Sequence, residues 1–197
     1  MRQSAPAALR NRQPILEALL PLLPESGLAV EIASGTGEHA VHFAGAAPTV
    51  QWQPTDISPH AIASINTWQK QAALANLLPA VVLDAAADSW PIGRADVVIN
   101  INMVHIAPWE ACLGLLRGAA RVLPAGGLLF MYGPYFIDDQ QAAPSNIQFD
   151  RSLRARDPSW GVRRLADVAA AAELCGLQQA AVVAMPANNV SVIYRRD

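Results

Sequence analysis

Residues 30–38 read VEIASGTGE, and this stretch decides the fold. An apolar run from Leu28 to Ala33 ends in a turn that carries Gly35 and Gly37, and a helical pattern follows it. Glycine removes the side chain where backbone and ligand must come close, and the free N–H groups at the start of a helix favour an anionic ligand group. Two glycines alone are equally consistent with a plain strand-to-helix turn, so the rest of the chain has to be considered.

Short apolar runs rich in β-branched residues alternate with longer segments of helical periodicity. These runs predict strands at Leu28 to Ala33, Val50 to Thr55, Ala80 to Leu83, Ala95 to Ile101 and Gly127 to Tyr132. Helices are predicted over Ser58 to Ala75, from Pro108 onward, and over Arg164 to Cys175. The second of these helices has an apolar stripe at Leu113, Leu116, Ala120 and Leu123. Such alternation is typical of βαβ units around a mostly parallel sheet with helices on both faces, which is an α/β fold.

The C-terminal part of the chain predicts a hairpin. Gln178 to Ala184 and Val190 to Arg195 have strand patterns, and the connection between them is too short for a parallel crossover, so the two strands must be antiparallel. Before them, residues 133–161 form the one long segment without a regular pattern. In a compact domain such a segment is more often a functional lid than a simple connector.

Composition limits the classes of function. The 197 residues suit a single domain, with residues 1–27 as an N-terminal helical segment; 52% of them are apolar and the formal net charge is −2. This balance supplies no positive field for nucleic acid, and no apolar stretch is long enough for a membrane span or a signal peptide. The two cysteines, Cys112 and Cys175, have the pattern of packing residues and favour a reducing, cytoplasmic setting without a metal site.

Two aspartates follow predicted strands on the same edge as the glycine turn. Asp56 comes at the end of the second strand, where a carboxylate can accept hydrogen bonds from both ribose hydroxyls, and Asp84 comes at the end of the third, where it can accept from an adenine amino group. Taken alone, Asp56 is also consistent with a helix cap. Ligands of open α/β sheets bind beyond the carboxyl ends of the strands, so this edge predicts a nucleoside site.

The spacing Gly35-x-Gly37-x-x-Ala40 also satisfies the dinucleotide fingerprint, so a nicotinamide enzyme is an alternative. Two features count against it. The chain lacks a second mononucleotide-binding half, and Glu31 places a carboxylate where it would repel a pyrophosphate and attract an α-ammonium group. S-adenosylmethionine carries such an ammonium group, and the residues therefore favour it as the cofactor.

The glycine turn, Asp56, Asp84 and the terminal hairpin resemble S-adenosylmethionine-dependent methyltransferases of class I, which have a seven-stranded Rossmann-like sheet. More narrowly, the chain resembles uncharacterised domain family 938, the bacterial relatives of animal methyltransferase-like protein 26. The matching pieces cover almost the whole chain and include Ala8 to Asn11, Glu31 to Gly37, Trp52 to Pro54, Asn100 to His105, Tyr132 to Pro134, Phe149 to Arg154, Asp157 to Gly161 and Met185 to Asn189. The sequence departs from the family pattern at Leu9, where a glutamate is expected, and from the pattern of the wider class at Ala33, where the class has its first glycine.

The resemblance implies a cofactor role for each matching position. Glu31 would act on the methionyl amine, and residues 35–37 would cradle the methionyl part. Asp56 would hold the ribose, Asp84 and Ala85 the adenine, and Asn100 the methionyl end. The cofactor-binding residues predicted in this way are Glu31, Ala33, Ser34, Gly35, Thr36, Gly37, Asp56, Ile57, Asp84, Ala85, Asn100, Ile101 and Asn102. The resemblance implies no substrate.

His105 follows the fourth predicted strand and is the candidate general base, with a role in ordering its loop as the alternative. Candidate substrate-binding residues are Asn11, Tyr132, Asn146 and Asn188. The last two are expected in loops, where the alternative role of an asparagine is to form a turn. The sequence thus predicts a methyltransferase that acts on a small molecule. A cofactor-binding regulator and an oxidoreductase are the alternatives, and a homodimer is an open expectation.

Overall fold

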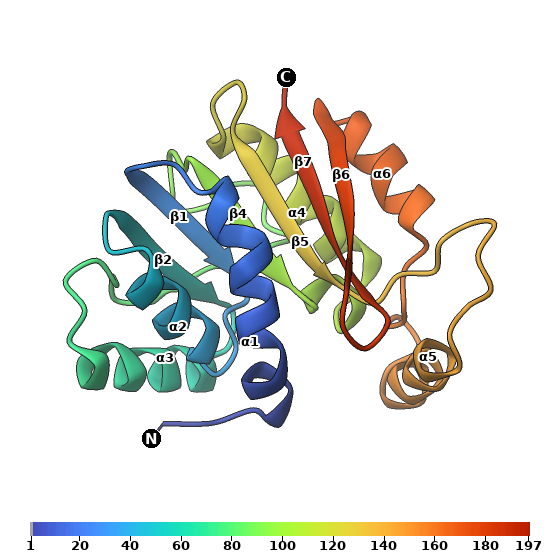
Figure 1. Ribbon diagram of the computed structural model, residues 1–197, viewed down its shortest axis with the longest axis horizontal. Coiled ribbons are helices and arrows are strands. Elements are labelled where there is room, and N and C mark those ends of the chain that lie inside the picture. Colours follow the sequence, from blue (N-terminus) through green and yellow to red (C-terminus); the bar gives the residue numbers. More distant parts are fainter. Residues whose placement is uncertain (1) are drawn as a thin grey trace.

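A computed structural model describes residues 2–197 and contains one seven-stranded sheet (Figure 1). Its strands are β1 (Gly27–Ile32), β2 (Val50–Asp56), β3 (Val81–Val82), β4 (Val97–Ile101), β5 (Leu128–Gly133), β6 (Leu177–Met185) and β7 (Asn189–Arg196). They lie in the order β3-β2-β1-β4-β5-β7-β6, in which β1 to β5 are parallel and β7 is antiparallel to both of its neighbours. The predicted Rossmann-like α/β fold with a C-terminal antiparallel hairpin is confirmed.

Helices cover both faces of this sheet. α1 (Pro6–Leu19), α2 (Glu38–Ala46) and α3 (Pro59–Ala72) lie on one face, and α4 (Trp109–Val122) and α6 (Leu165–Glu173) lie on the other (Figure 1). One core joins Phe43 of α2 to Trp52 of β2, and the other joins Leu115 of α4 to Tyr194 of β7. Since β1 and β4 are buried on both faces, their side chains are almost continuously apolar, as expected of central parallel strands.

The apolar stripe predicted for α4 is shifted. The buried side chains are Cys112, Leu115, Leu116, Ala119 and Val122, whereas Leu113 and Ala120 are half-exposed. The cause lies in two glycines: a Cβ on Gly114 would lie 2.2 Å from the carbonyl oxygen of Ala85, and one on Gly118 would lie 2.1 Å from the Trp90 ring. This close approach turns the glycine face of α4 inward, which a pattern based on large apolar residues does not reveal.

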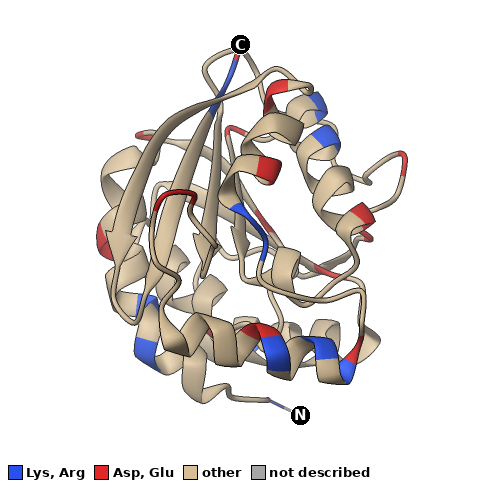
Figure 2. Ribbon diagram, turned by 90° about the vertical axis from the view of Figure 1, so that its right-hand side faces the viewer, with Lys and Arg blue, Asp and Glu red and all other residues tan. Residues whose placement is uncertain are grey.

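Residues 133–161 are not one irregular segment, because α5 (Pro144–Arg156) occupies much of this stretch. Pro144 starts the helix at its first turn, and only Asn146 and Leu153 of its residues are buried. The helix stands apart from the sheet (Figure 1) and carries charges of both signs in its C-terminal half (Figure 2). Without an apolar stripe it has no periodicity to detect. In residues 2–197 no helix is both long and apolar enough to cross a membrane.

Candidate functional site

The glycine turn follows β1 at the carboxyl edge of the sheet. Its backbone is left-handed at Ala33 (φ 58°), Gly35 (φ 57°) and Gly37 (φ 93°). A Cβ on Gly37 would lie 2.9 Å from the Cα atom of Ile65, so the packing of α3 requires glycine there. A Cβ on Gly35 would meet no atom within 4 Å, so the space over Gly35 is open and a ligand can approach the backbone. Ala33 keeps the left-handed backbone at the position where the wider class has glycine.

Asp56, at the end of β2, shapes this turn. Its Oδ2 accepts a hydrogen bond from the N–H of Gly35 (2.9 Å) and its Oδ1 accepts one from the N–H of Ser58 (2.9 Å). Each carboxylate oxygen has a second lone pair, which leaves room for hydrogen bonds from a ligand hydroxyl. Asp56 is therefore both part of the turn and a candidate ribose acceptor.

Glu31 lies beneath the turn and is buried. Its Oε2 accepts a hydrogen bond from the indole Nε1–H of Trp52 at 2.8 Å. Burial raises the pKa of Glu31 to about 7, although the Trp52 hydrogen bond opposes this rise. The carboxyl group therefore keeps its proton to a higher pH than an exposed glutamate does, and a nearby cation would favour the ionised form.

A cavity of about 360 Å³ lies beside the turn, between the loop after β3 and the loop that precedes α4. It brings together four predicted cofactor residues, Ala33, Ile57, Asp84 and Ala85, and adds apolar residues that include Met103, Ile106, Pro108 and Trp160. Asp84 Oδ1 accepts a hydrogen bond from the N–H of Ala86 at 2.8 Å, and the other carboxylate oxygen has no such bond. An apolar slot with one carboxylate suits a flat, amino-bearing ring.

The residues after β4 divide into buried and exposed positions. Asn100 is fully buried; its Nδ2 donates to the carbonyl oxygen of Ile32 at 3.1 Å, and its Oδ1 has no partner within residues 2–197. Neither Asn100 nor Ile101 lines this cavity or the larger one beyond β4 and β5, whereas Asn102 lines the larger one. Asn102 has a left-handed backbone (φ 64°) that turns the chain into a short 3-10 helix, Met103–His105.

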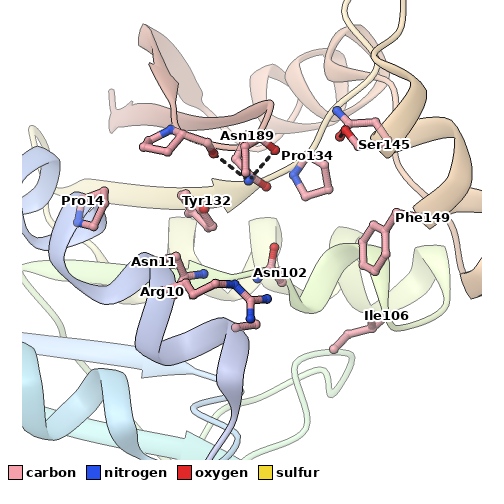
Figure 3. A pocket seen from close by; sticks show the side chains of 14 residues that line it. Arg10, Asn11, Pro14, Asn102, Ile106, Tyr132, Pro134, Ser145, Phe149 and Asn189 are labelled. Atoms are coloured by element: carbon pink, nitrogen blue, oxygen red, sulfur yellow. Dashed lines mark hydrogen bonds between the residues drawn. The ribbon is translucent and has the colours of Figure 1, made fainter.

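A second cavity, of about 610 Å³, lies beyond the carboxyl ends of β4 and β5 (Figure 3). It shares one lining residue, Ile106, with the smaller cavity. Three of the four predicted substrate residues, Asn11, Tyr132 and Asn146, line it. Asn11 Oδ1 lies 2.8 Å from Nε2 of His39, and burial lowers the pKa of His39 to about 4, so the neutral ring donates this hydrogen bond.

Asn188 lies outside this cavity and lines a neighbouring one of about 260 Å³. Asn146 was expected in a loop, but it lies in the first turn of α5, where it is buried. Its Nδ2 donates to the carbonyl oxygen of Asn188 (2.9 Å), and Asn188 Nδ2 donates to Ser145 Oγ (2.9 Å). These bonds tie α5 to the β6–β7 hairpin, so both amides hold the wall of the cavity.

His105 is fully buried and lines neither cavity. Its Nδ1 accepts a hydrogen bond from the N–H of Arg163 at 3.3 Å, and its carbonyl oxygen accepts one from Gly161 at 2.9 Å. Burial lowers its pKa to about 3, so the ring is neutral and the lone pair of Nδ1 is already engaged. This geometry favours the alternative role of ordering the loop over that of a general base.

Sequence reasoning missed several residues of this edge, among them Arg10, Phe149 and Glu38. Arg10 and Phe149 line the larger cavity, although each lies within a stretch that carried the family resemblance. Glu38, in the first turn of α2, is buried and accepts hydrogen bonds from Ser4 Oγ (2.8 Å) and the N–H of Ala5 (2.6 Å). These bonds fix the start of α1 against the glycine turn, a long-range contact with no local signal.

Several solved structures share this fold. CalO1, a methyltransferase in calicheamicin biosynthesis in its SAH bound form, matches with a TM-score of 0.81 and 16% identity over 97% of this chain and 54% of its own. The mitomycin 7-O-methyltransferase MmcR matches with a TM-score of 0.83 and 19% identity over 97% and 54%. The S-adenosylmethionine-dependent methyltransferase SibL, in its apo form, matches with a TM-score of 0.79 and 21% identity over 96% and 55%.

The chain thus spans about half the length of these structures, and at such identities the likeness shows the fold alone. A family model gives the narrower result. It is described as protein of unknown function (DUF938), and it matches residues 2–196. The chain therefore belongs to the DUF938 family, and its fold is that of class I S-adenosylmethionine-dependent methyltransferases.

Proposed function

We propose that this protein is an S-adenosylmethionine-dependent methyltransferase that acts on a small molecule held in the 610 Å³ cavity. One observation carries the proposal: the 360 Å³ cavity gathers Ala33, Ile57, Asp84 and Ala85 beside the open glycine turn, and it shares the lining residue Ile106 with the larger cavity. A donor bound along the turn would lie next to an acceptor bound beyond β4 and β5. The methyltransferase fold of the neighbours supports the same kind of reaction.

The residues present fit the cofactor. The open space over Gly35 admits the methionyl part, Asp56 faces the turn where a ribose would lie, and Asp84 stands in an apolar slot suited to adenine. The ionised form of Glu31 would attract the α-ammonium group. S-adenosylmethionine supplies an electrophilic methyl group on a sulfonium when it is bound.

A dinucleotide fits less well, for an electrostatic reason. The pyrophosphate of a dinucleotide binds at the N-terminus of the helix that follows the glycine turn. In this protein the first turn of α2 carries Glu38, whose buried carboxylate is occupied by Ser4 and Ala5. Two carboxyl groups, Glu31 and Glu38, therefore flank the place that a pyrophosphate would need, which favours a cationic cofactor.

In the proposed reaction, the residues of this chain position the reactants and do not supply a strong acid or base. Among the residues that the structure describes, no Asp, Glu or His side chain lines the larger cavity. The proposed reaction therefore rests on holding nucleophile and methyl group in line at about 3–3.5 Å in a site shielded from water. The acceptor atom should be one that loses its proton readily without a strong side-chain base.

Isothermal titration calorimetry with S-adenosylmethionine, S-adenosylhomocysteine and NAD tests the cofactor. We expect both S-adenosyl ligands to bind and NAD not to bind; tight NAD binding alone would refute the proposal. Incubation of the protein and S-adenosylmethionine with fractionated metabolite pools then tests turnover through the formation of S-adenosylhomocysteine. Binding without turnover in every pool would instead favour a cofactor-binding regulator.

A further inference from the structure

The larger cavity contains one charged side chain, Arg10, from the second turn of α1. Within residues 2–197 no acidic side chain lines the cavity, and the Arg10 guanidinium has neither a hydrogen-bond acceptor nor an ion-pair partner. Figure 3 shows its side chain reaching from α1 beside Asn102. A guanidinium carries five N–H donors in a planar fork that matches a carboxylate in two parallel hydrogen bonds.

Apolar and polar side chains share the wall that lies across the cavity from α1. The Phe149 ring on α5 is part of this wall (Figure 3), and so are the polar side chains of Ser145 and Asn146 on the same helix. Ile106 and Pro134 add apolar surface to the cavity. A ligand that satisfies both walls combines an anionic group at one side with a flat or compact apolar body at the other.

The anionic group next to Arg10 could belong to the acceptor or to the cofactor, whose methionyl part also carries a carboxylate. No residue of the glycine turn lines the larger cavity, and Arg10 does not line the smaller one. The two cavities share only Ile106. This separation places Arg10 on the acceptor side.

We propose that the larger cavity binds an acceptor with a carboxylate on a ring-sized apolar body, and that Arg10 is the residue that binds this carboxylate. The inference rests on the proposed methyl transfer, since that reaction is what makes the occupant of this cavity an acceptor. It adds the substrate class and one specificity-determining residue.

Matched pairs of probes test the inference directly: benzoate, 4-hydroxybenzoate, phenylacetate and cinnamate, each beside its primary amide. Their binding is measured by ligand-observed NMR at up to about 10 mM, a range that covers dissociation constants of about 1 mM. The titrations use the protein alone and the protein saturated with S-adenosylhomocysteine. We expect the carboxylates to bind about tenfold or more tightly than the amides, the smallest effect typical of a charge-assisted hydrogen bond.

Two substitutions on α1 give the matched comparison. Arg10→Gln should remove the preference for carboxylates, and Arg12→Gln should keep it, because Arg12 is on the same helix but does not line the cavity. Arg10 is exposed and unpaired, so its replacement should leave the thermal unfolding midpoint unchanged. Arg10→Lys keeps the charge without the planar fork and should retain part of the preference.

Three outcomes would overturn the inference: no binding of any carboxylate, equal binding of carboxylates and amides, or a preference that survives Arg10→Gln. A tenfold weaker affinity of Arg10→Gln for S-adenosylhomocysteine would instead assign Arg10 to the methionyl carboxylate, and would overturn it too. Failure of the wild-type protein to bind S-adenosylhomocysteine at all would refute the proposed function and not the carboxylate site, because the free protein is titrated separately.

Discussion

Glu31→Gln separates the two properties that the structure combines in this side chain, burial and charge. The carboxyl group is buried under the glycine turn and accepts a hydrogen bond from Trp52, and its pKa is raised from 4.5 to about 7. Glutamine has nearly the same shape, its carbonyl oxygen can accept the same bond, and it does not ionise. The substitution therefore removes the titration while it leaves the packing in place.

The magnitude follows from linkage. Because the folded-state pKa is raised, the native protein binds this proton more tightly than the unfolded chain does, and the resulting stability is fully present below pH 4.5. This stability falls as the pH rises above 4.5 and is lost above about pH 7. Because the pKa of Glu31 is raised from 4.5 to about 7 on folding, the loss of stability is about 3 kcal/mol. The variant lacks this loss, so its free energy of unfolding relative to wild type should increase by about that amount between pH 4.5 and 8.

Urea unfolding of both proteins at several pH values measures this difference. His105 contributes in the opposite sense, because its lowered pKa of about 3 makes stability fall as the pH drops below its ordinary value of 6.5. That contribution is common to both proteins and cancels in the difference. A difference that stays constant from pH 4.5 to 8 would refute the assignment of a protonated, buried Glu31.

Calorimetry of the cofactor gives a second readout of the same group. If the α-ammonium group binds beside Glu31, it favours the ionised carboxylate, so binding near pH 7 should release protons from this group. The binding enthalpy of wild type should then depend on the ionisation enthalpy of the buffer, and that of Glu31→Gln should not. Equal buffer dependence in the two proteins would place the ammonium group elsewhere.

Asp56→Asn should weaken S-adenosylmethionine binding by about 1.5–3 kcal/mol, the range for hydrogen bonds to a charged group, as calorimetry would show; unchanged affinity in a folded variant would leave Asp56 only a role in the turn. Gly35→Val should abolish binding, because the left-handed backbone (φ 57°) costs a side chain about 1–2 kcal/mol and the new side chain would fill the open space; binding that persists would move the site off the turn. His105→Ala should lower the free energy of unfolding by about 1–3 kcal/mol in urea titrations, since the Arg163 N–H loses its acceptor, and a 10²–10⁴-fold loss of turnover at unchanged stability would restore the general base.

The fold was predictable because its signals are local and repeated. The strands β1, β4 and β5 are short and mostly apolar runs, and the three-residue connection between β6 and β7 permits only an antiparallel pair. The register of α4 was not predictable, because it depends on the contacts of Gly114 and Gly118 with a loop about thirty residues earlier in the chain. α5 was missed for the opposite reason: it buries two residues, so nothing in its sequence repeats at the helical period.

The candidate site was predictable only where strand ends determine it. Ile57, Asp84 and Ala85 follow parallel strands and meet in one cavity because the carboxyl ends of such strands share an edge. His105 illustrates the limit: its position after β4 is close to the site in sequence, yet its ring turns inward to Arg163 and Tyr135. Sequence position gives the neighbourhood of a side chain but not its direction.

The carboxylates at this edge also hold the protein together, which changes how their variants should be interpreted. Asp56 accepts a hydrogen bond from the N–H of Gly35, and Glu38 accepts hydrogen bonds from Ser4 and Ala5. The two carboxylates therefore hold the turn and the start of α1 in place, and removal of either should cost stability as well as affinity for the proposed cofactor. Arg10 forms no such bonds within the described chain. A loss of binding in its variants would therefore report on the ligand alone, which makes Arg10 the cleaner probe of what this edge of the sheet recognises.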